Sequence, residues 1–273
     1  MQTLNSQTIL SSNHYTMAAN VLYQYSVMAA LMDGVAEQGL PLDRLHEHGN
    51  FGLGTFRHMA GEMAMNEGRV WQMTSDGGIR ELDTVVEAKQ DNDASCCPFA
   101  MVTNFQPTIH DALPVDANSI KSKDDFSTWL DDRLPANARN QFVALRLKGS
   151  FASVTIRVIP AQRFRGQKLA ELTAAQSEHT ATELRGTVVG FRSPGYAAGF
   201  GVPGLHLHFL SDDDTYGGHI LALDMGSQKG QAHGIKFEAA IMSKLHLELP
   251  TDDADFNNAP LKPDLEAIQK AEG

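Results

Sequence analysis

The sequence has very little cysteine: Cys96 and Cys97 are the only two among 273 residues, and they are adjacent. Neighbouring cysteines rarely pair with each other, because the short ring that the bridge would close is strained. Two thiols also cannot supply the paired Cys-x-x-Cys ligands of structural zinc sites. We therefore expect neither a disulfide framework nor a thiolate metal site, and two reduced thiols are typical of a cytoplasmic protein.

Long apolar runs and an excess of basic residues are also absent. No stretch reaches the roughly 18 apolar residues of a transmembrane helix, and residues 1–16 contain no basic segment followed by an apolar one, as a signal peptide would. Lys and Arg number 22 against 33 Asp and Glu, which gives a net charge of −11. An acidic chain repels phosphate backbones and anionic lipid, so we expect no nucleic-acid and no membrane partner.

Apolar periodicity divides the chain into a mixed half and a strand-rich half. Apolar residues at spacings of three and four predict a helix over 18–38, and Ser122 followed by acidic residues predicts another over 123–134. From 142 to 249 the pattern is almost entirely that of strands, with the first two divided by Lys148-Gly149-Ser150. The expected fold class is α+β, with an N-terminal helical and mixed-sheet domain over 1–140 and a C-terminal antiparallel domain over 141–273.

Three histidines lie within GLHLHFLSDDDTYGGH, residues 204–219. Successive side chains of a strand point to opposite faces, so His206 and His208 face the same way. The turn-forming residues that follow can reverse the chain and bring His219 alongside on the next strand. Three imidazoles with an open fourth position are the arrangement of a catalytic zinc, although imidazole also suits iron, nickel and copper.

The spacing alone does not establish a metal site, because a His-x-His pair in a strand is often surface decoration or a hydrogen-bonded core group. His46 and His48 form a second such pair, in LHEHGN. That segment reads as a short helix, in which residues two apart diverge by about 200°. We therefore expect His46 and His48 to be solvated or to cap the helix.

Several stretches together resemble the α-acetolactate decarboxylase family and occur in the order of that family. They are HGNFGLGTF (48–56), GEM (61–63), PFAMVTNFQP (98–107), FVALRLKGSF (142–151), TIRVIPAQ (155–162), VVGFRSP (188–194) and the histidine block. The chain departs from the family pattern at Asn50, at Ala60 and after the Gly-Gly-His element, where an aspartate is common. None of these positions carries an expected role.

The resemblance implies a zinc ion as cofactor, bound by His206, His208 and His219. It also implies that Thr55 and Arg157 bind the substrate and that Arg157 takes part in catalysis.

Two carboxylates are implied as catalytic residues by the same resemblance. One is Glu62 of the GEM element, the expected proton donor. The other comes from the C-terminal tail, where Glu272 matches best and Glu266 is the alternative.

The activity that the resemblance implies is metal-dependent decarboxylation of 2-acetolactate, a small 2-hydroxy-3-oxo acid. The products would be (R)-acetoin and CO₂, formed through a zinc-stabilised enediolate in acetoin and 2,3-butanediol biosynthesis. The implied architecture is an N-terminal mixed β-sheet with helices and a C-terminal small antiparallel β-barrel. The protein is expected to be a cytoplasmic homodimer.

Two other classes of protein remain open. A cupin-type metal oxygenase also uses His-x-His in a small barrel, with a carboxylate a few residues on, and Asp212 lies four residues after His208. Its further histidine ligand has only His246 as a poor match. A non-catalytic metal-binding module is the other alternative, but structural zinc sites usually have four ligands, and only three are evident.

Overall fold

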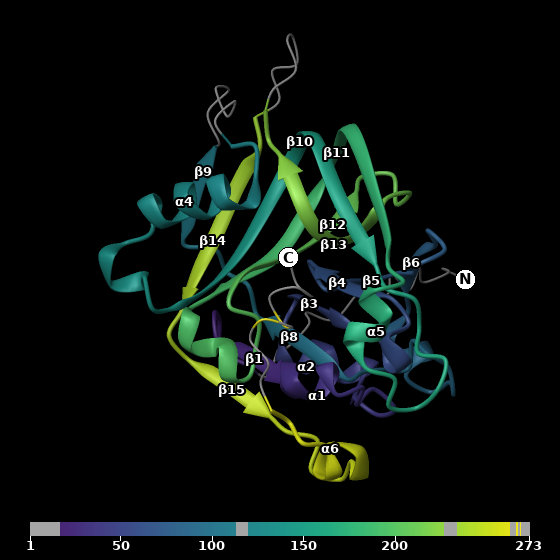
Figure 1. Cartoon of the computed structure of the whole chain (residues 1–273). Coiled ribbons are helices and arrows are strands. Elements are labelled where there is room, and N and C mark those ends of the chain that lie inside the picture. Colours follow the sequence, from purple (N-terminus) through teal and green to yellow (C-terminus); the bar gives the residue numbers. More distant parts are fainter. Residues whose placement is uncertain (1–16, 113–119, 227–233, 263–265, 267, 269–273) are drawn as a thin grey trace, which may run out of the picture.

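The computed structural model describes residues 17–112, 120–226, 234–262, 266 and 268. Two sheets dominate it, with the six-stranded sheet above the seven-stranded one in the view of Figure 1. The α+β class predicted from the sequence is confirmed. Among the described residues, none of the helices has the length and apolar character needed to span a bilayer.

The lower sheet is mixed, as expected, because its strand β1 runs parallel to β15 and every other neighbour is antiparallel. In order across the sheet, the strands are β15 (Leu245–Glu248), β1 (Leu22–Tyr25), β8 (Phe99–Thr103), β3 (Phe51–Thr55), β4 (Glu62–Asn66), β5 (Arg69–Met73) and β6 (Ile79–Leu82).

The helix predicted over 18–38 is wrong. The segment forms strand β1 and then a short helix, α1 (Met28–Met32), separated by Ser26 at φ 66°. Strand β1 is buried throughout and pairs with β15 on one side and β8 on the other. Its apolar residues therefore satisfy a central strand, and long-range pairing overrides the helical spacing.

The upper sheet is antiparallel. In order, its strands are β11 (Ser177–Ser193), β12 (Gly204–Ser211), β13 (Gly217–Asp224), β10 (Phe142–Val158), β14 (Lys236–Met242) and β9 (Ile109–Ala112). Strand β10 also pairs with β11. It is one strand of 17 residues, whereas the sequence predicted two, because Gly149 lies opposite Gly186 and the pairing continues through both.

The sheet pairings cross the domain boundary expected at residue 140. Strand β9 belongs to the upper sheet, and β15 belongs to the lower one. The division into two domains remains a prediction, but each sheet draws a strand from the other half of the sequence.

The remaining elements are short. The α-helices are α2 (Leu45–His48), α3 (Thr84–Glu87), α4 (Lys123–Arg133), α5 (Leu169–Thr173) and α6 (Ala254–Asn258); the 3₁₀ turns are η1 (Leu42–Arg44), η2 (Arg57–Met59), η4 (Ala136–Ala138) and η5 (Gly195–Gly199); and β2 (Leu40–Pro41) pairs with β7 (Cys96–Cys97). The helix predicted after Ser122 is confirmed, and the Ser122 Oγ accepts a hydrogen bond from the Asp125 amide at 3.0 Å. Phe126 of α4 packs edge-on against Phe237 of β14 in the core of the upper sheet.

Candidate metal and active site

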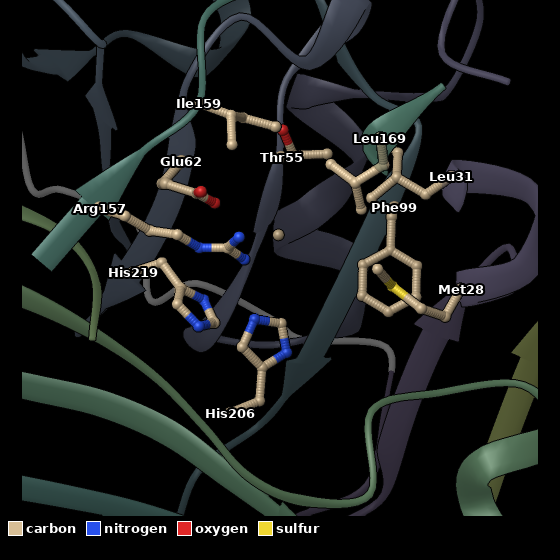
Figure 2. Close-up of a pocket in the computed structure, with 11 residues that line it drawn as sticks. Met28, Leu31, Thr55, Glu62, Phe99, Arg157, Ile159, Leu169, His206 and His219 are labelled. Atoms are coloured by element: carbon tan, nitrogen blue, oxygen red, sulfur yellow. The ribbon is translucent and has the colours of Figure 1, made fainter. Parts of the chain in front are cut away.

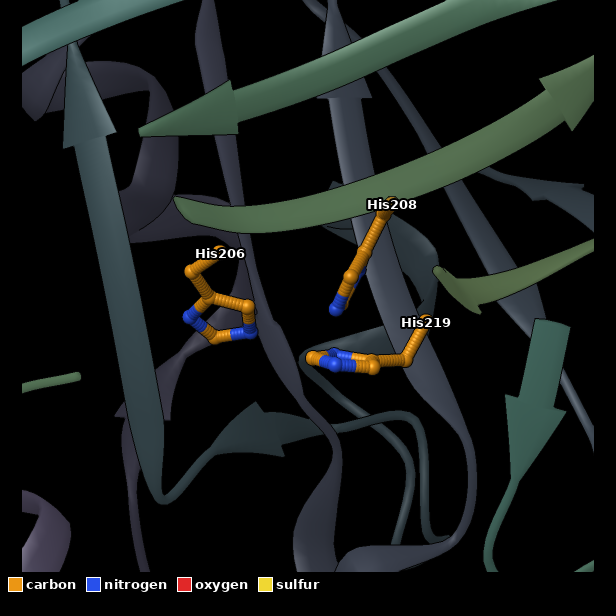
Figure 3. Close-up of side chains that lie close together, drawn as sticks. All are labelled: His206, His208 and His219. Carbon is orange, nitrogen blue, oxygen red and sulfur yellow. The ribbon is translucent and has the colours of Figure 1, made fainter. Parts of the chain in front are cut away.

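The three histidines of residues 204–219 converge, as the sequence predicted. His206 and His208 lie on β12, and His219 lies on β13 directly opposite His208. Each imidazole offers one nitrogen, and these nitrogens all lie within 4.8 Å of one another (Figure 3). All three side chains are buried, so a metal ion held here would be shielded from bulk water.

The tautomer of neutral His208 is set by its neighbour on the lower sheet. Its Nδ1 lies 2.8 Å from the carbonyl oxygen of Met63. A carbonyl only accepts, so Nδ1 carries the proton and the Nε2 lone pair is left for a ligand bond. Nε2 makes no hydrogen bond to any described residue and lies 3.5 Å from a carboxylate oxygen of Glu62.

Burial also keeps these imidazoles neutral. It lowers the pKa of His208 to about 4, with the bond to Met63 opposing the change and the nearby Arg157 adding to it. Burial likewise holds the pKa of His206 and of His219 well below the usual value. Three neutral nitrogen donors that converge fit a divalent ion such as zinc.

Because these pKa values are lowered, the metal-free protein should lose unfolding free energy as the pH falls. Between pH 6.5 and 4 the unfolded chain binds protons that the folded chain does not, so stability is present above pH 6.5 and is lost as the pH falls. At pH 5, His208 alone should cost roughly 2 kcal/mol of unfolding free energy relative to pH 7.5. Urea unfolding of chelated protein at both pH values measures the loss. His208→Gln should show a smaller pH dependence, and an unchanged one would contradict the interpretation.

Arg157 of β10 joins the cluster through strand pairing. It lies directly opposite His219 on β13, and residues opposite each other in an antiparallel pair project from the same face. Its side chain is 3% exposed. Figure 2 shows the guanidinium beside His219 and reaching between Glu62 and His206. The predicted arginine is therefore brought to the predicted metal ligands.

Thr55 and Glu62 reach the site from the lower sheet. They are directly opposite each other, at the end of β3 and the start of β4, and both are buried. The Thr55 hydroxyl donates to the carbonyl oxygen of Gly61 at 2.9 Å, which leaves its lone pairs available as acceptors. The two sheets thus place an acid and a hydroxyl opposite the histidines and the arginine.

The loop between these strands is held in an unusual conformation. His58 and Met59 have φ near 55°, and Gly61 has φ 109°. A Cβ on Gly61 would lie 2.4 Å from the Met73 carbonyl oxygen, so only glycine fits. Gln72 donates to the carbonyl of Ala60 at 2.8 Å and fixes the loop from β5. Such strain persists only where the surroundings impose it, and here it sets the position of Glu62.

The site is the polar end of a pocket whose other end is apolar. Five apolar side chains form this end, which we call the apolar wall. The sequence did not predict it, because these residues come from separate elements and look like ordinary core residues. Its members are Met28, Leu31, Phe99, Ile159 and Leu169 (Figure 2). The cavity itself is small, about 20 Å³, which is little more than the space that one water molecule needs. A small, partly apolar molecule suits this pocket better than a large coenzyme.

The two candidates for the tail carboxylate lie near the end of the chain. Glu272 lies outside the described residues, and Glu266 is exposed. Ile268, however, is buried in the same cluster as Leu169, which lines the pocket. The tail therefore passes close to the apolar wall at residue 268.

The positions of Asp212 and His246 disfavour the cupin alternative. Asp212 lies on an exposed turn within 3.5 Å of Arg185, and His246 lies on β15, where it stacks on Tyr23. Neither lines the pocket.

His48, predicted to be solvated or capping, is instead buried and stacked on Tyr23 with ring centroids 3.4 Å apart. The close packing of α2 against β1 was not visible in the helical spacing.

Known proteins of one family match this chain in sequence and in fold. The family model described as alpha-acetolactate decarboxylase matches residues 22–263. The alpha-acetolactate decarboxylase of Methanosarcina mazei is 37% identical over 93% of this chain and 81% of its own length, and that of Brevibacillus brevis is 34% identical over 89% and 77%. The crystal structure of alpha-acetolactate decarboxylase from Bacillus subtilis superposes with a TM-score of 0.80 at 30% identity, over 92% of this chain and 99% of that one. The chain belongs to the alpha-acetolactate decarboxylase family of enzymes.

Proposed function

We propose that this chain catalyses the metal-dependent decarboxylation of 2-acetolactate to acetoin and CO₂. The observation that carries the proposal is one buried pocket in which two imidazoles of the three-histidine cluster, those of His206 and His219, meet an arginine, a carboxylate, a hydroxyl and an apolar wall. A site built only to hold a structural ion needs neither the arginine nor the apolar wall.

The reaction explains why this chemistry is needed. Acetolactate is a β-keto acid. When its C–CO₂ bond breaks, the electron pair moves onto the ketone oxygen and leaves an enediolate. A proton must then reach the carbon that lost CO₂, and acetoin results. When bound to His206, His208 and His219, a zinc ion would supply Lewis acidity for the charge that develops on oxygen.

Arg157 and Thr55 are proposed to hold the substrate. A guanidinium offers parallel N–H donors that match a carboxylate, so Arg157 orients the group that departs as CO₂. The Thr55 hydroxyl already donates to Gly61, so its oxygen accepts a hydrogen bond from the substrate hydroxyl. The apolar wall would receive the methyl groups and exclude water.

Glu62 is proposed to deliver the proton. It is buried beside His208 and lies across the pocket from Met28, Phe99 and Leu169 in Figure 2, so we propose that it protonates one face of the enediolate and gives (R)-acetoin. Glu272 is proposed to close the site from the tail. The burial of Ile268, four residues earlier, supports a tail that approaches the pocket.

The remaining proposals rest on the family resemblance. We propose a homodimer, a cytoplasmic location and a role in acetoin and 2,3-butanediol biosynthesis. We also propose that the upper sheet forms a small antiparallel barrel. That architecture is supported by the pairing circuit in which β10 contacts β11, β11 contacts β12, β12 contacts β13, and β13 returns to β10.

Purified protein incubated with racemic acetolactate should form acetoin of predominantly one hand. Chelation should abolish the activity without unfolding the protein, and added zinc should restore it, because the imidazoles supply no Lewis acidity of their own. Chiral gas chromatography measures the product, and circular dichroism measures the fold. Unfolding on metal removal would favour a structural metal module. Acetoin formation unaffected by chelation would contradict the metal-dependent mechanism.

A further inference from the structure

The strand register extends the site beyond the pocket in one direction. Arg157 on β10 lies opposite His219 on β13 and, on its other side, opposite Glu178 on β11. The three side chains therefore form a row across three strands on one face of the sheet. The row begins at an exposed carboxylate and ends at a buried metal-ligand candidate.

Gln176, which immediately precedes β11, bridges the first two members of this row. Its Oε1 accepts a hydrogen bond from Arg157 Nη1 at 3.3 Å, and its Nε2 donates to Glu178 Oε1 at 2.5 Å. A guanidinium only donates and a carboxylate only accepts, so this arrangement admits a single orientation of the amide. Glu178 thus fixes Gln176, and Gln176 holds one arm of the guanidinium.

We propose that Gln176 is a positioning residue for Arg157, and that its neutrality sets how strongly the site holds the substrate carboxylate. The inference rests on the proposed role of Arg157 as the carboxylate-binding group. An amide orients the guanidinium without bringing a negative charge to it. A glutamate of the same shape has no N–H group to offer Glu178, whose carboxylate would repel it. It would instead form an ion pair with Arg157 and compete with the substrate for the guanidinium N–H groups.

Decarboxylation makes this effect visible in the kinetics. Charge leaves the carboxylate as CO₂ forms, so weaker carboxylate binding costs more in the ground state than in the transition state. Changes at Gln176 should therefore raise KM without lowering kcat, because the bound substrate loses at least as much stabilisation as the transition state. A residue that only stabilised the fold would instead lower the melting temperature and reduce the active fraction, with KM unaltered.

The test compares Gln176→Glu, Gln176→Met and the wild-type protein, each loaded with zinc, in acetolactate kinetics. Gln176→Glu should raise KM about tenfold or more, because its carboxylate would engage the charged N–H groups that otherwise bind the substrate. Gln176→Met removes the acceptor but adds no charge, so it should raise KM less. Gln106→Glu adds the same charge at an exposed position away from the pocket and should leave KM within about twofold.

A KM for Gln176→Glu within twofold of the wild-type value, in folded and active protein, would overturn the inference. So would equal KM values for the Glu and Met variants, since the charge would then have no effect. An inactive wild-type protein would instead contradict the proposed function itself.

Discussion

His206→Ala should lower kcat/KM for acetolactate by about a thousandfold or more, the largest effect expected of any single change in this chain. A Lewis acid contributes several kcal/mol to stabilisation of the developing oxyanion, and each 1.36 kcal/mol is a factor of ten in rate. Without His206, two imidazoles remain, and an ion held by two ligands dissociates or loses its orientation.

The measurement pairs kinetics with metal content. Zinc bound per chain, determined by atomic absorption after dialysis, should fall together with activity. His179→Ala is the matched control, because His179 is an exposed histidine on β11 outside the pocket. It should keep both zinc and activity. A His206→Ala protein that lacks metal but retains activity within tenfold of the wild type would rule out the metal-dependent mechanism.

The convergence of the three histidines was predictable because its geometry is local. Two histidines with one residue between them share a face of any strand, and a turn rich in Asp and Gly returns the chain within ten residues. The structure places His219 opposite His208 in register, as this reasoning requires. Short-range periodicity and turn chemistry were sufficient to bring the three side chains together.

The segment 18–38 shows where the same kind of reasoning fails. Its apolar spacing is compatible with a helix, but Tyr23 and Tyr25 lie in a central strand between β15 and β8. Opposite Tyr23 lie Val102 of β8 and His246 of β15, which come 79 and 223 residues later in the sequence, so nothing local signals the pairing. A strand buried on both faces has no alternation to distinguish it from a buried helix.

The other candidate site residues could not be predicted from local spacing; they needed both the family resemblance and the register of the sheets. The family resemblance identified Thr55, Glu62 and Arg157, which no spacing connects. The register of the two sheets then explains why they meet: Thr55 lies opposite Glu62, and Arg157 lies opposite His219. Gln176 was missed, because a polar residue at the start of a strand carries no signal until its partners are known.

Glu62→Gln should lower kcat by about 10²- to 10⁴-fold, the usual contribution of a positioned general acid. Glutamine has nearly the same shape, so the pocket and the contact near His208 are kept while the transferable proton is lost. The substrate should still bind, so KM should change little. The enediolate would then leave the pocket and be protonated on either face in bulk water, and the acetoin should approach a racemic mixture.

The enantiomeric ratio makes this experiment more informative than the rate alone. Loss of fold or of metal lowers the rate but leaves the remaining active molecules equally selective. Glu238→Gln is the control, because Glu238 is also buried but pairs with Arg146 and Lys236 away from the pocket. It should reduce stability and leave both kcat and the enantiomeric ratio nearly unchanged. If Glu62→Gln still released acetoin of one hand at the wild-type rate, Glu62 would not be the proton donor, and the tail carboxylate would become the leading candidate.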